Sequence, residues 1–408
     1  MKSLPELAPY NDCTGCMLCA DTCPKGAIDF SVDENGFWKP RVDTERCIGC
    51  KLCEKKCRAV RSAELSPVCE QPYKGHAAAD EVRRRSTSGG IFYALAETAI
   101  RDRHAVVYGA VCEGRAIRHK GVETLEELQA LQGSKYAQSN TSGIYKEVKV
   151  HLAAGRFVLF SGTPCQVQAL HTYLGKEQEN LLTVDLVCHG VPSYKLVERH
   201  LAVNKGEGIL HFRTKAFGWG RDSFVTMSRC GQAVAITDRF NNLFYQMFQT
   251  ELAFRPNCYQ CRFNSVHRAG DITIGDYWLV RHTEEYDPLG LSTILPNTAK
   301  GAAFLAGCNN ICREPVAWEQ ALANNPRLVT DRREYLHTAL SSRIGKLYRY
   351  LPAWLADRLL GTLRSKRRPF SLLWLKYLAW QRAAYQPRYD AALSKLQKEL
   401  AQTSSPHS

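Results

Sequence analysis

The chain has 408 residues, of which 45% are hydrophobic and 23% are charged. This composition is typical of a folded globular protein with two or three domains. No apolar signal core opens the sequence and no segment approaches the ~20 apolar residues of a membrane span, so we expect a cytoplasmic protein. The net charge of +14 does not indicate a nucleic-acid partner, because much of the excess lies in residues 327–408, with 16 Lys/Arg against 5 Asp/Glu.

Eight cysteines lie near the N-terminus in two runs with the same spacing. Each run reads C-x2-C-x2-C-x3-C, over residues 13–23 and 47–57, and this is the bacterial ferredoxin pattern for two [4Fe–4S] clusters. In this pattern the fourth Cys of each run ligates the cluster of the other run. We therefore assign Cys13, Cys16, Cys19 and Cys57 to one cluster, and Cys23, Cys47, Cys50 and Cys53 to the second. Zinc is the alternative because C-x2-C pairs also bind zinc, but two four-Cys runs in one register favour the clusters.

Residues 1–64 are predicted to form a ferredoxin-like domain around these runs. Two short strands, over 27–30 and 38–42, flank Asn35-Gly36, which is a strong hairpin turn signal. Such a domain has a small apolar core, so we expect the clusters to supply much of its folding energy. This part of the sequence predicts an electron-transfer module.

Residues 65–150 contain two loops with the composition of a phosphate or nucleotide site. After a linker at 65–80, the turn Ser86-Thr-Ser-Gly-Gly90 opens an apolar helix, and such a helix start binds phosphates. An ordinary helix cap is the alternative. The loop over 131–139 combines a glycine, hydroxyls, Lys135 and Tyr136, which suit the phosphates and ring of a nucleotide, although a solvated loop can have the same residues. The other expected elements here are a helix over 91–100, strands over 105–112 and 116–122, and a helix capped by Thr124.

Residues 151–315 alternate apolar strands with helices, which predicts a parallel sheet. Ligands collect at the carboxyl ends of such strands, and Cys165 and Cys188 both lie just past one. The pair Cys258 and Cys261 supplies two thiols on one short loop and, with the first two cysteines, would complete a third four-thiolate site. Isolated cysteines that are merely buried are the alternative. The expected elements are strands over 157–160, 181–187 and 271–275 and helices over 166–174 and 193–204.

Residues 316–408 are predicted to be a basic, aromatic helical tail. Its aromatic and cationic residues resemble an interfacial anchor, which gives a peripheral membrane contact as one expectation. A helical cap on the main domain with a solvated basic face is the alternative.

Six motifs in a fixed order resemble the coenzyme F420 hydrogenase/dehydrogenase beta-subunit family. They are STSGG, GSKYAQS, SGTPCQV, DLVCHGVPS, CYQCRF and DITIGDYW, and the resemblance covers roughly residues 70–315. It implies an FAD beside a [4Fe–4S] cluster held by Cys165, Cys188, Cys258 and Cys261. It also implies FAD contacts from Ser88, Gly89, Gly90, Gly133, Ser134, Lys135 and Tyr136. Asp276 and His189 are further candidate contacts. The alternative for His189 is a loop histidine whose hydrogen bonds are made within the protein.

The expected architecture therefore combines α+β and α/β parts: the ferredoxin-like domain, a mixed α/β flavin-binding core divided at 65–150 and 151–315, and the helical tail. Clusters pass single electrons and a flavin exchanges two, so both together predict an iron–sulfur flavoprotein oxidoreductase. Its partners would be an external ferredoxin-like or F420-like carrier and an organic substrate, and the family also includes bacterial relatives encoded with polysaccharide genes. A non-catalytic subunit that feeds electrons to a partner enzyme is the alternative.

Overall fold

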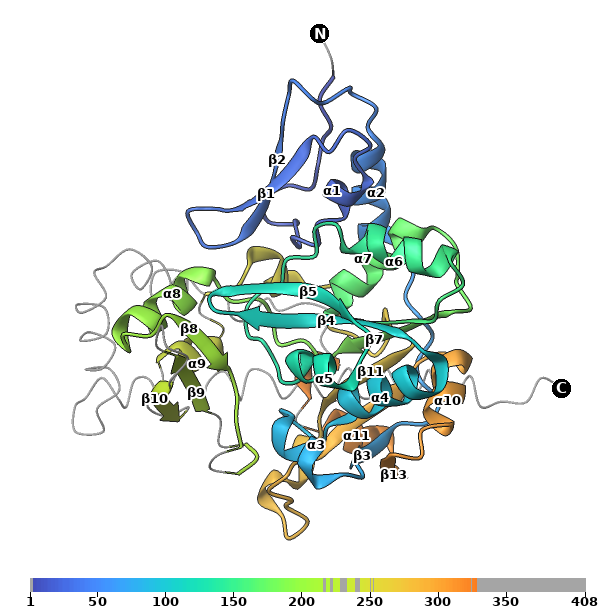
Figure 1. Ribbon diagram of the computed structural model, residues 1–408, viewed down its shortest axis with the longest axis vertical. Coiled ribbons are helices and arrows are strands. Elements are labelled where there is room, and N and C mark those ends of the chain that lie inside the picture. Colours follow the sequence, from blue (N-terminus) through green and yellow to red (C-terminus); the bar gives the residue numbers. More distant parts are fainter. Residues whose placement is uncertain are drawn as a thin grey trace, which may run out of the picture.

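The structure of the protein is a computed structural model, and it describes residues 3–215, 218–220, 223–227, 233–238, 243–249, 251, 253–323 and 325–328. An N-terminal unit (blue in Figure 1) lies at one end of a larger body built on a twisted sheet. The elements of the unit are α1 (Leu18–Thr22), β1 (Ile28–Val32), β2 (Trp38–Val42) and α2 (Leu52–Ser62). The α-helices of the body are α3 (Asp80–Arg85), α4 (Ile91–Arg103), α5 (Leu125–Leu128), α6 (Ile144–Ala153), α7 (Pro164–Leu174), α8 (Tyr194–Val203), α9 (Leu243–Gln249), α10 (Ala299–Ala306) and α11 (Trp318–Leu322). Short 3-10 turns are η1 (Gln129–Leu131), η2 (Pro256–Gln260), η3 (Trp278–His282) and η4 (Pro326–Leu328).

The hairpin expected in the N-terminal unit is confirmed. β1 and β2 pair antiparallel, with Ile28 opposite Val42. The connection turns at Gly36, whose φ of 83° is in the left-handed region that glycine adopts without strain. Asp33 stabilises the turn because its carboxylate accepts from the backbone N–H of Asn35 (2.9 Å) and of Phe37 (2.9 Å).

Among the described residues, eight strands form the main sheet in the order β13-β3-β12-β11-β7-β6-β4-β5. The strands from β11 to β4 run parallel to one another, as the alternation of strands and helices predicted. The strands on either side are antiparallel, so the sheet is mixed. The strands are β3 (Tyr73–Ala77), β4 (Val106–Glu113), β5 (Ala116–Val122), β6 (Val158–Gly162), β7 (Leu181–Leu186), β11 (Ile272–Asp276), β12 (Ser292–Pro296) and β13 (Ile311–Pro315).

The prediction of a linker over residues 65–80 is wrong for its second half. β3 lies inside the sheet, where it pairs with both β12 and β13. In its sequence YKGHA, Tyr73 and Ala77 lie on one face and the polar Lys74 and His76 on the other, so no hydrophobic run marked it as a strand. Two neighbouring strands distant in sequence supply the hydrogen bonds that order it.

A second, smaller sheet lies beside the body. Among the described residues it contains β8 (Gly208–His211), β9 (Ser223–Met227) and β10 (Ala233–Asp238), in antiparallel order β10-β9-β8. Helices α8 and α9 accompany it (Figure 1).

Apolar side chains cover both faces of the main sheet, as the two-residue period of a strand requires. On β6, Val158 and Phe160 pack with α6 and α7 on the face toward the N-terminal unit, whereas Leu159 faces α4 and α10. The parallel strands are therefore buried on both faces, and their carboxyl ends are rigid supports for the loops that follow.

A buried ion pair fastens the parallel strands to the loop before β11. Arg268 and Asp185, whose side chains are 1% and 0% exposed, lie 3.2 Å apart. Asp185 also accepts from the backbone N–H groups of Ala269 and Gly270 (3.1 Å each). The pair thus fixes the position of the end of β7, and Asp185 itself lies three residues before Cys188.

No helix among the described residues is both long and apolar enough to cross a bilayer. The expected helical tail falls mostly on residues 329–408, outside the described residues, so the interfacial anchor stays a prediction. Of that region the structure describes α11 and η4. Trp318 at the start of α11 is buried and donates to the carbonyl oxygen of Cys69 (3.0 Å), which places this helix on the body.

Replacing Asp185 with Ala should lower the free energy of unfolding by about 3–5 kcal/mol, because it leaves the Arg268 guanidinium buried without its counter-charge. Urea denaturation of the full chain, followed by tryptophan fluorescence, measures the change. Glu179→Ala, an exposed acid in the loop before β7, is the control and should change stability by no more than about 0.5 kcal/mol. Equal effects of the two substitutions would contradict the role of the pair.

Candidate functional site

The two cysteine runs fold into the same local backbone. Gly15 and Gly49 occupy equivalent positions and have φ of 66° and 70°. Two residues later, Met17 and Lys51 also have positive φ, at 63° and 57°, immediately before α1 and α2. No pattern in the sequence marks Met17 and Lys51 as left-handed, because residues with side chains rarely adopt this conformation. In each run the first two cysteines precede the helix, and the third is the second residue of the helix.

The first four-thiol set, set I, consists of Cys13, Cys16, Cys19 and Cys57. The last of these comes from α2 and joins the others across the unit. Burial raises the pKa of the Cys16 thiol to about 11, and the neighbouring Cys13 and Cys57 raise it further. Burial also raises the pKa of Cys19, with the same two cysteines and Cys16 adding to the effect. Cys13 and Cys57 are therefore electrostatic neighbours of both thiols, and Cys53 of the second run is a further neighbour of Cys19.

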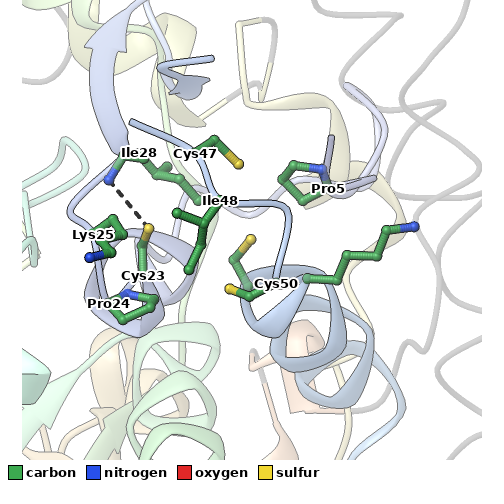
Figure 2. Close-up of a pocket in the computed structure, with 11 residues that line it drawn as sticks. Pro5, Cys23, Pro24, Lys25, Ile28, Cys47, Ile48 and Cys50 are labelled. Atoms are coloured by element: carbon green, nitrogen blue, oxygen red, sulfur yellow. Dashed lines mark hydrogen bonds between the residues drawn. The ribbon is translucent and has the colours of Figure 1, made fainter. Parts of the chain in front are cut away.

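Set II consists of Cys23, Cys47, Cys50 and Cys53, which line one cavity with Pro5, Pro24, Lys25, Ala27, Ile28, Ile48 and Lys51. Figure 2 shows Cys23, Cys47 and Cys50 around this cavity, with Ile48 between them. The backbone N–H of Ala27 donates to Cys23 Sγ (3.3 Å). Burial raises the pKa of Cys53, and Cys23 and Cys50 raise it further. Cys23 of the first run therefore lies with three cysteines of the second run, as the crossed assignment expects.

Set III consists of Cys165, Cys188, Cys258 and Cys261, which come from three separate parts of the chain. Cys165 is the second residue of α7, just beyond β6, and Cys188 is the second residue after β7. Burial raises the pKa of Cys165 well above its usual value, and Cys188 and Cys261 contribute. Burial raises the pKa of Cys258 to about 12, again with Cys261 and Cys188 contributing. The four thiols are therefore electrostatic neighbours at the carboxyl ends of adjacent parallel strands.

Local hydrogen bonds orient two thiols of set III. A capping box between Thr163 and Gln166 starts α7, and the Thr163 hydroxyl lies 3.2 Å from Cys165 Sγ. The Cys258 sulfur accepts from the backbone N–H of Val191 (3.4 Å). Such bonds hold a thiol in place and favour its thiolate form.

Set I lies between the other two sets. Cys16 of set I is among the groups that raise the pKa of Cys165 in set III. Both residues also pack against one apolar cluster that contains Leu18 and Tyr145. On the other side, Cys53 of set II is among the groups that act on Cys19. The order in space is therefore set II, set I, set III.

A buried arginine joins set I to the body. Arg255 is completely buried and precedes Cys258 by one short turn. Its guanidinium donates to the carbonyl oxygens of Cys13 (3.1 Å) and Trp38 (2.9 Å), and to the side-chain oxygen of Gln138 (2.7 Å). Gln138 in turn donates to the carbonyl oxygen of Gly15 (3.0 Å). One cation thus connects the loop of set I with the loop of set III.

The start of α6 makes a second connection to set I. Asp21 accepts from the backbone N–H groups of Gly143 (2.6 Å) and Tyr145 (3.0 Å), where an acid is favoured by the helix dipole. Burial raises the pKa of Asp21, and these two hydrogen bonds oppose that rise. The hydroxyls of Thr141 (3.0 Å) and Tyr145 (2.8 Å) both donate to the carbonyl oxygen of Cys16. The N-terminal unit is therefore held against the body by specific polar contacts.

Within the part of the chain that the structure describes, no three His, Cys, Asp or Glu side chains are placed to bind a single ion. The fold brings the cysteines of each set together in fours, and four thiolates are a ligand set both of zinc and of [4Fe–4S] clusters.

The two loops predicted to contact a nucleotide lie side by side. The backbone N–H of Ser134 donates to Thr87 Oγ1 (2.7 Å), and Gln132 Nε2 donates to Ser86 Oγ (3.2 Å). Gly90 has a φ of 88° and begins α4. Gly133 has room around it, since an added Cβ would meet only Thr87 Oγ1, at 3.8 Å.

Several polar atoms of these loops bond within the protein. Ser88 Oγ donates to the carbonyl oxygen of Leu291 (2.8 Å), and the hydroxyl of Ser292 accepts from the N–H of Gly89 (2.9 Å). Lys135 Nζ donates to the carbonyl oxygens of Ala130 (3.1 Å), Leu131 (3.0 Å) and Gln132 (2.8 Å). Burial lowers the pKa of Lys135 to about 8.

Asp276, at the end of β11, is joined to Tyr136 through an arginine that the sequence did not single out. Arg213 donates to both carboxylate oxygens of Asp276 (2.8 and 3.1 Å) and to the Tyr136 hydroxyl (3.5 Å). Trp219 Nε1 also donates to Asp276 (2.9 Å), and its ring stacks on Trp278 with centroids 5.0 Å apart. The predicted residues of both loops and of β11 are thus brought to one region.

Lys215 is a second residue that sequence reasoning missed. Its ammonium donates to the carbonyl oxygens of Arg83 (2.6 Å), Ser88 (2.5 Å) and Leu289, and thereby holds the turn at Ser88. Burial lowers the pKa of Lys215 to about 7, and Arg213 lowers it further. No spacing rule marks Arg213 or Lys215, because they follow β8, far in sequence from both loops.

His189, beside Cys188, contacts buried neighbours. Its Nε2 lies 3.2 Å from the carbonyl oxygen of Phe248, and its Nδ1 lies 3.3 Å from Arg327. Glu251 lies 3.6 Å from Nε2 and also pairs with Arg327. These contacts agree with the alternative, a loop histidine whose ring nitrogens bond within the protein.

Two family models match this chain. Residues 155–312 match the C-terminal region of the coenzyme F420 hydrogenase/dehydrogenase beta subunit, and residues 12–59 match a 4Fe-4S dicluster domain. An uncharacterized ferredoxin of Methanocaldococcus jannaschii is 44% identical over 45 residues, which are 11% of this chain and 57% of the ferredoxin. The chain thus spans little more than half the length of that relative. A chain of the F420-reducing [NiFe] hydrogenase complex from Methanosarcina barkeri, solved with xenon, superposes with a TM-score of 0.43 and 18% identity, over 65% of this chain and 89% of that one.

Gly15→Ala should destabilise the protein and lower its iron content. The substitution places a side chain at φ of 66°, which costs about 1–2 kcal/mol, and its Cβ would lie 2.7 Å from the Arg255 guanidinium. Gly155→Ala is a matched control, since its φ is 74° but its surroundings are open. Urea denaturation and iron analysis of anaerobically purified protein measure both effects. Equal stability and full iron in the two variants would show that the contact of Gly15 with Arg255 is unimportant.

Proposed function

We propose that this chain is an iron–sulfur flavoprotein oxidoreductase, because residues 155–312 match the coenzyme F420 hydrogenase/dehydrogenase beta-subunit family and residues 12–59 match a 4Fe-4S dicluster domain. Electrons pass between an external carrier, the clusters of the N-terminal unit, a third cluster and an FAD. The FAD site takes an organic substrate or an F420-like carrier. The second possibility comes from the description of the matched family, which names coenzyme F420.

In this proposal set I and set II each hold one [4Fe–4S] cluster. The donor chemistry fits, because each set contains four cysteines and thiolates are the usual ligands of such clusters. Burial raises the pKa values of Cys16, Cys19 and Cys53, so cluster assembly must release the protons of these thiols. Each cluster takes ligands from both cysteine runs, so a bound cluster also stabilises the fold of this unit.

Set III holds the third [4Fe–4S] cluster. Its support is the meeting of Cys165, Cys188 and the C-x2-C pair at the carboxyl ends of β6 and β7. The single observation that carries the whole proposal is the adjacency of Cys16 and Cys165 in one apolar cluster. It makes the N-terminal clusters and the third cluster successive stations for an electron.

FAD binds where the turn at Ser88–Gly90 meets the loop at Gly133–Tyr136. When bound, a flavin exchanges two electrons with a substrate and single electrons with a cluster. The chain supplies a glycine with open space at 133, the start of α4, and the cations Arg213 and Lys215 near the turn. These groups suit the phosphates of a dinucleotide, and Tyr136 offers an aromatic face.

The alternative function is an electron-transfer subunit that feeds a partner enzyme. The observation in its favour is that Ser88, Lys135 and Asp276 already bond within the protein. Turnover of small-molecule electron carriers by the isolated chain, dependent on bound FAD, separates the two functions, because a relay without a substrate site should show none.

Anaerobically reconstituted protein should contain about twelve irons and one FAD per chain, from three cubes of four irons. Cys258→Ala should remove about four irons and leave the other clusters, because Cys258 belongs only to set III. Iron and sulfide analysis with electron paramagnetic resonance of the reduced protein measures this loss.

Cys112→Ala is the matched control, since Cys112 is another partly buried thiol, located on β4 outside all three sets. It should keep all the iron. About eight irons in the wild-type protein would refute the third cluster, and fewer than eight would refute the assignment of set I or set II.

Affinity for FAD should fall as the pH rises through about 7. Lys215 holds the turn at Ser88 as an ammonium, and its pKa of about 7 means that it is protonated below this pH and loses its proton above it. Flavin fluorescence after gel filtration at a series of pH values measures release. Lys215→Met should bind FAD weakly at all pH values, whereas the exposed Lys149→Met should keep the wild-type profile. A wild-type profile in the Lys215 variant would exclude this role.

A further inference from the structure

The cavity of set II reaches the surface of the protein. Of the twelve cysteines in the three sets, Cys50 is the one that is exposed. The cysteines of set I and set III are intermediate or buried. A protein carrier can therefore approach the thiols of set II most closely, and set II is also the end of the order set II, set I, set III.

Apolar side chains surround this opening although they lie in water. Leu4, Ile48 and Leu52 are 48%, 51% and 47% exposed. They lie together, because a Cβ at Gly49 would be 3.2 Å from the carbonyl oxygen of Ser3, so the segment of Leu4 runs along the loop of Ile48. Exposed apolar side chains gathered in one place mark an interaction surface more often than single ones do.

The charged side chains that line the cavity are positive. The eleven residues that line the cavity include Lys25 and Lys51 and contain no Asp or Glu. Figure 2 shows Lys25 beside Cys23 and Pro24 on one side of the cavity. Of the acids nearby, Glu54 is buried and its carboxylate accepts from the backbone N–H of Glu6, and the exposed carboxylate of Glu6 shares Arg58 with it. The surface of Leu4, Lys25, Ile48, Lys51 and Leu52, which we call the set II rim, is therefore apolar and cationic.

We propose that the set II rim is the docking surface for a small acidic protein that carries one electron. The inference rests on the proposed function, since it requires a cluster in set II. In the step, the reduced carrier loses one electron and the cluster of set II gains it, with no bond made or broken. Opposite charges speed the encounter, and the apolar side chains form the small, transient contact that electron-transfer partners use.

The rim favours a protein over a small organic carrier. A small organic ligand needs a concave pocket that buries most of its surface. The cavity behind the rim is lined by four cysteines, so the cluster itself occupies it. The remaining surface offers exposed side chains, which bind a complementary protein face.

Stopped-flow mixing tests this proposal with full-length, reconstituted protein and a purified acidic [2Fe–2S] ferredoxin that has been reduced and freed of reductant. The second-order rate constant for oxidation of the ferredoxin should fall about tenfold in Lys25→Glu/Lys51→Glu at low ionic strength. The difference should shrink in high salt, which screens charges at a surface. Leu52→Ser, which lies outside the cavity lining, should also slow the reaction.

Arg103→Glu/Lys149→Glu is the matched control, with the same change of net charge on α4 and α6. It should react within about twofold of the wild type at the same ionic strength, because neither α4 nor α6 contributes a residue to the lining of the set II cavity. Reduction of every variant by dithionite should be unchanged, which shows that the cluster of set II is intact.

The proposal would be overturned by unchanged rates in both the Lys25/Lys51 and Leu52 variants, or by an equal loss of rate in the Arg103/Lys149 control. A wild-type rate constant that does not fall with salt would also overturn it. So would self-association of the chain that Leu52→Ser abolishes, because that result would assign the rim to a second copy of the chain. Iron content distinguishes this failure from failure of the proposed function. Fewer than eight irons in the wild type removes a cluster from the N-terminal unit, whereas full iron with unaltered rates rejects the rim alone.

Discussion

The buried guanidinium of Arg255 connects the two parts of the molecule. It bonds to the backbone around Cys13 and Trp38 and to Gln138, while its own backbone leads directly to Cys258. A buried cation is costly unless acceptors surround it. The N-terminal unit supplies two of these acceptors and the body supplies the third. The relation of set I to set III depends on that contact, because neither part alone supplies the acceptors.

The main sheet decides where set III lies. β6 and β7 are parallel neighbours, so Cys165 and Cys188 leave the sheet at the same edge. Asp185 and Arg268 tie the end of β7 to the segment that follows Cys261. The same edge carries Asp276 at the end of β11, where Arg213 joins it to Tyr136. Thiols and the proposed flavin loops are thus positioned by one rigid element.

The three sets differ in their surroundings. Set II contains the exposed Cys50 and has an apolar and cationic rim, whereas the carbonyl oxygen of Cys16 in set I accepts hydrogen bonds from Thr141 and Tyr145 near the start of α6. Set III lies at the edge of the main sheet, and its four cysteines are all partly buried. Solvent exposure and nearby charge both tune the potential of an iron–sulfur cluster, so in the proposed function the three clusters have different potentials.

Spacing within the sequence alone indicated the candidate ligands of sets I and II, the turn at Gly36 and the strands of the parallel centre, because these features depend on neighbouring residues and on side-chain alternation. The sequence also placed Cys165 and Cys188 after strands, but which cysteines gather beside them depended on the sheet order. The strand at 73–77, the left-handed Met17 and Lys51, and the contacts of Arg213, Lys215 and Arg255 were decided only by the tertiary structure. Each of these is stabilised by partners distant in the chain, and no local pattern encodes which distant groups will meet.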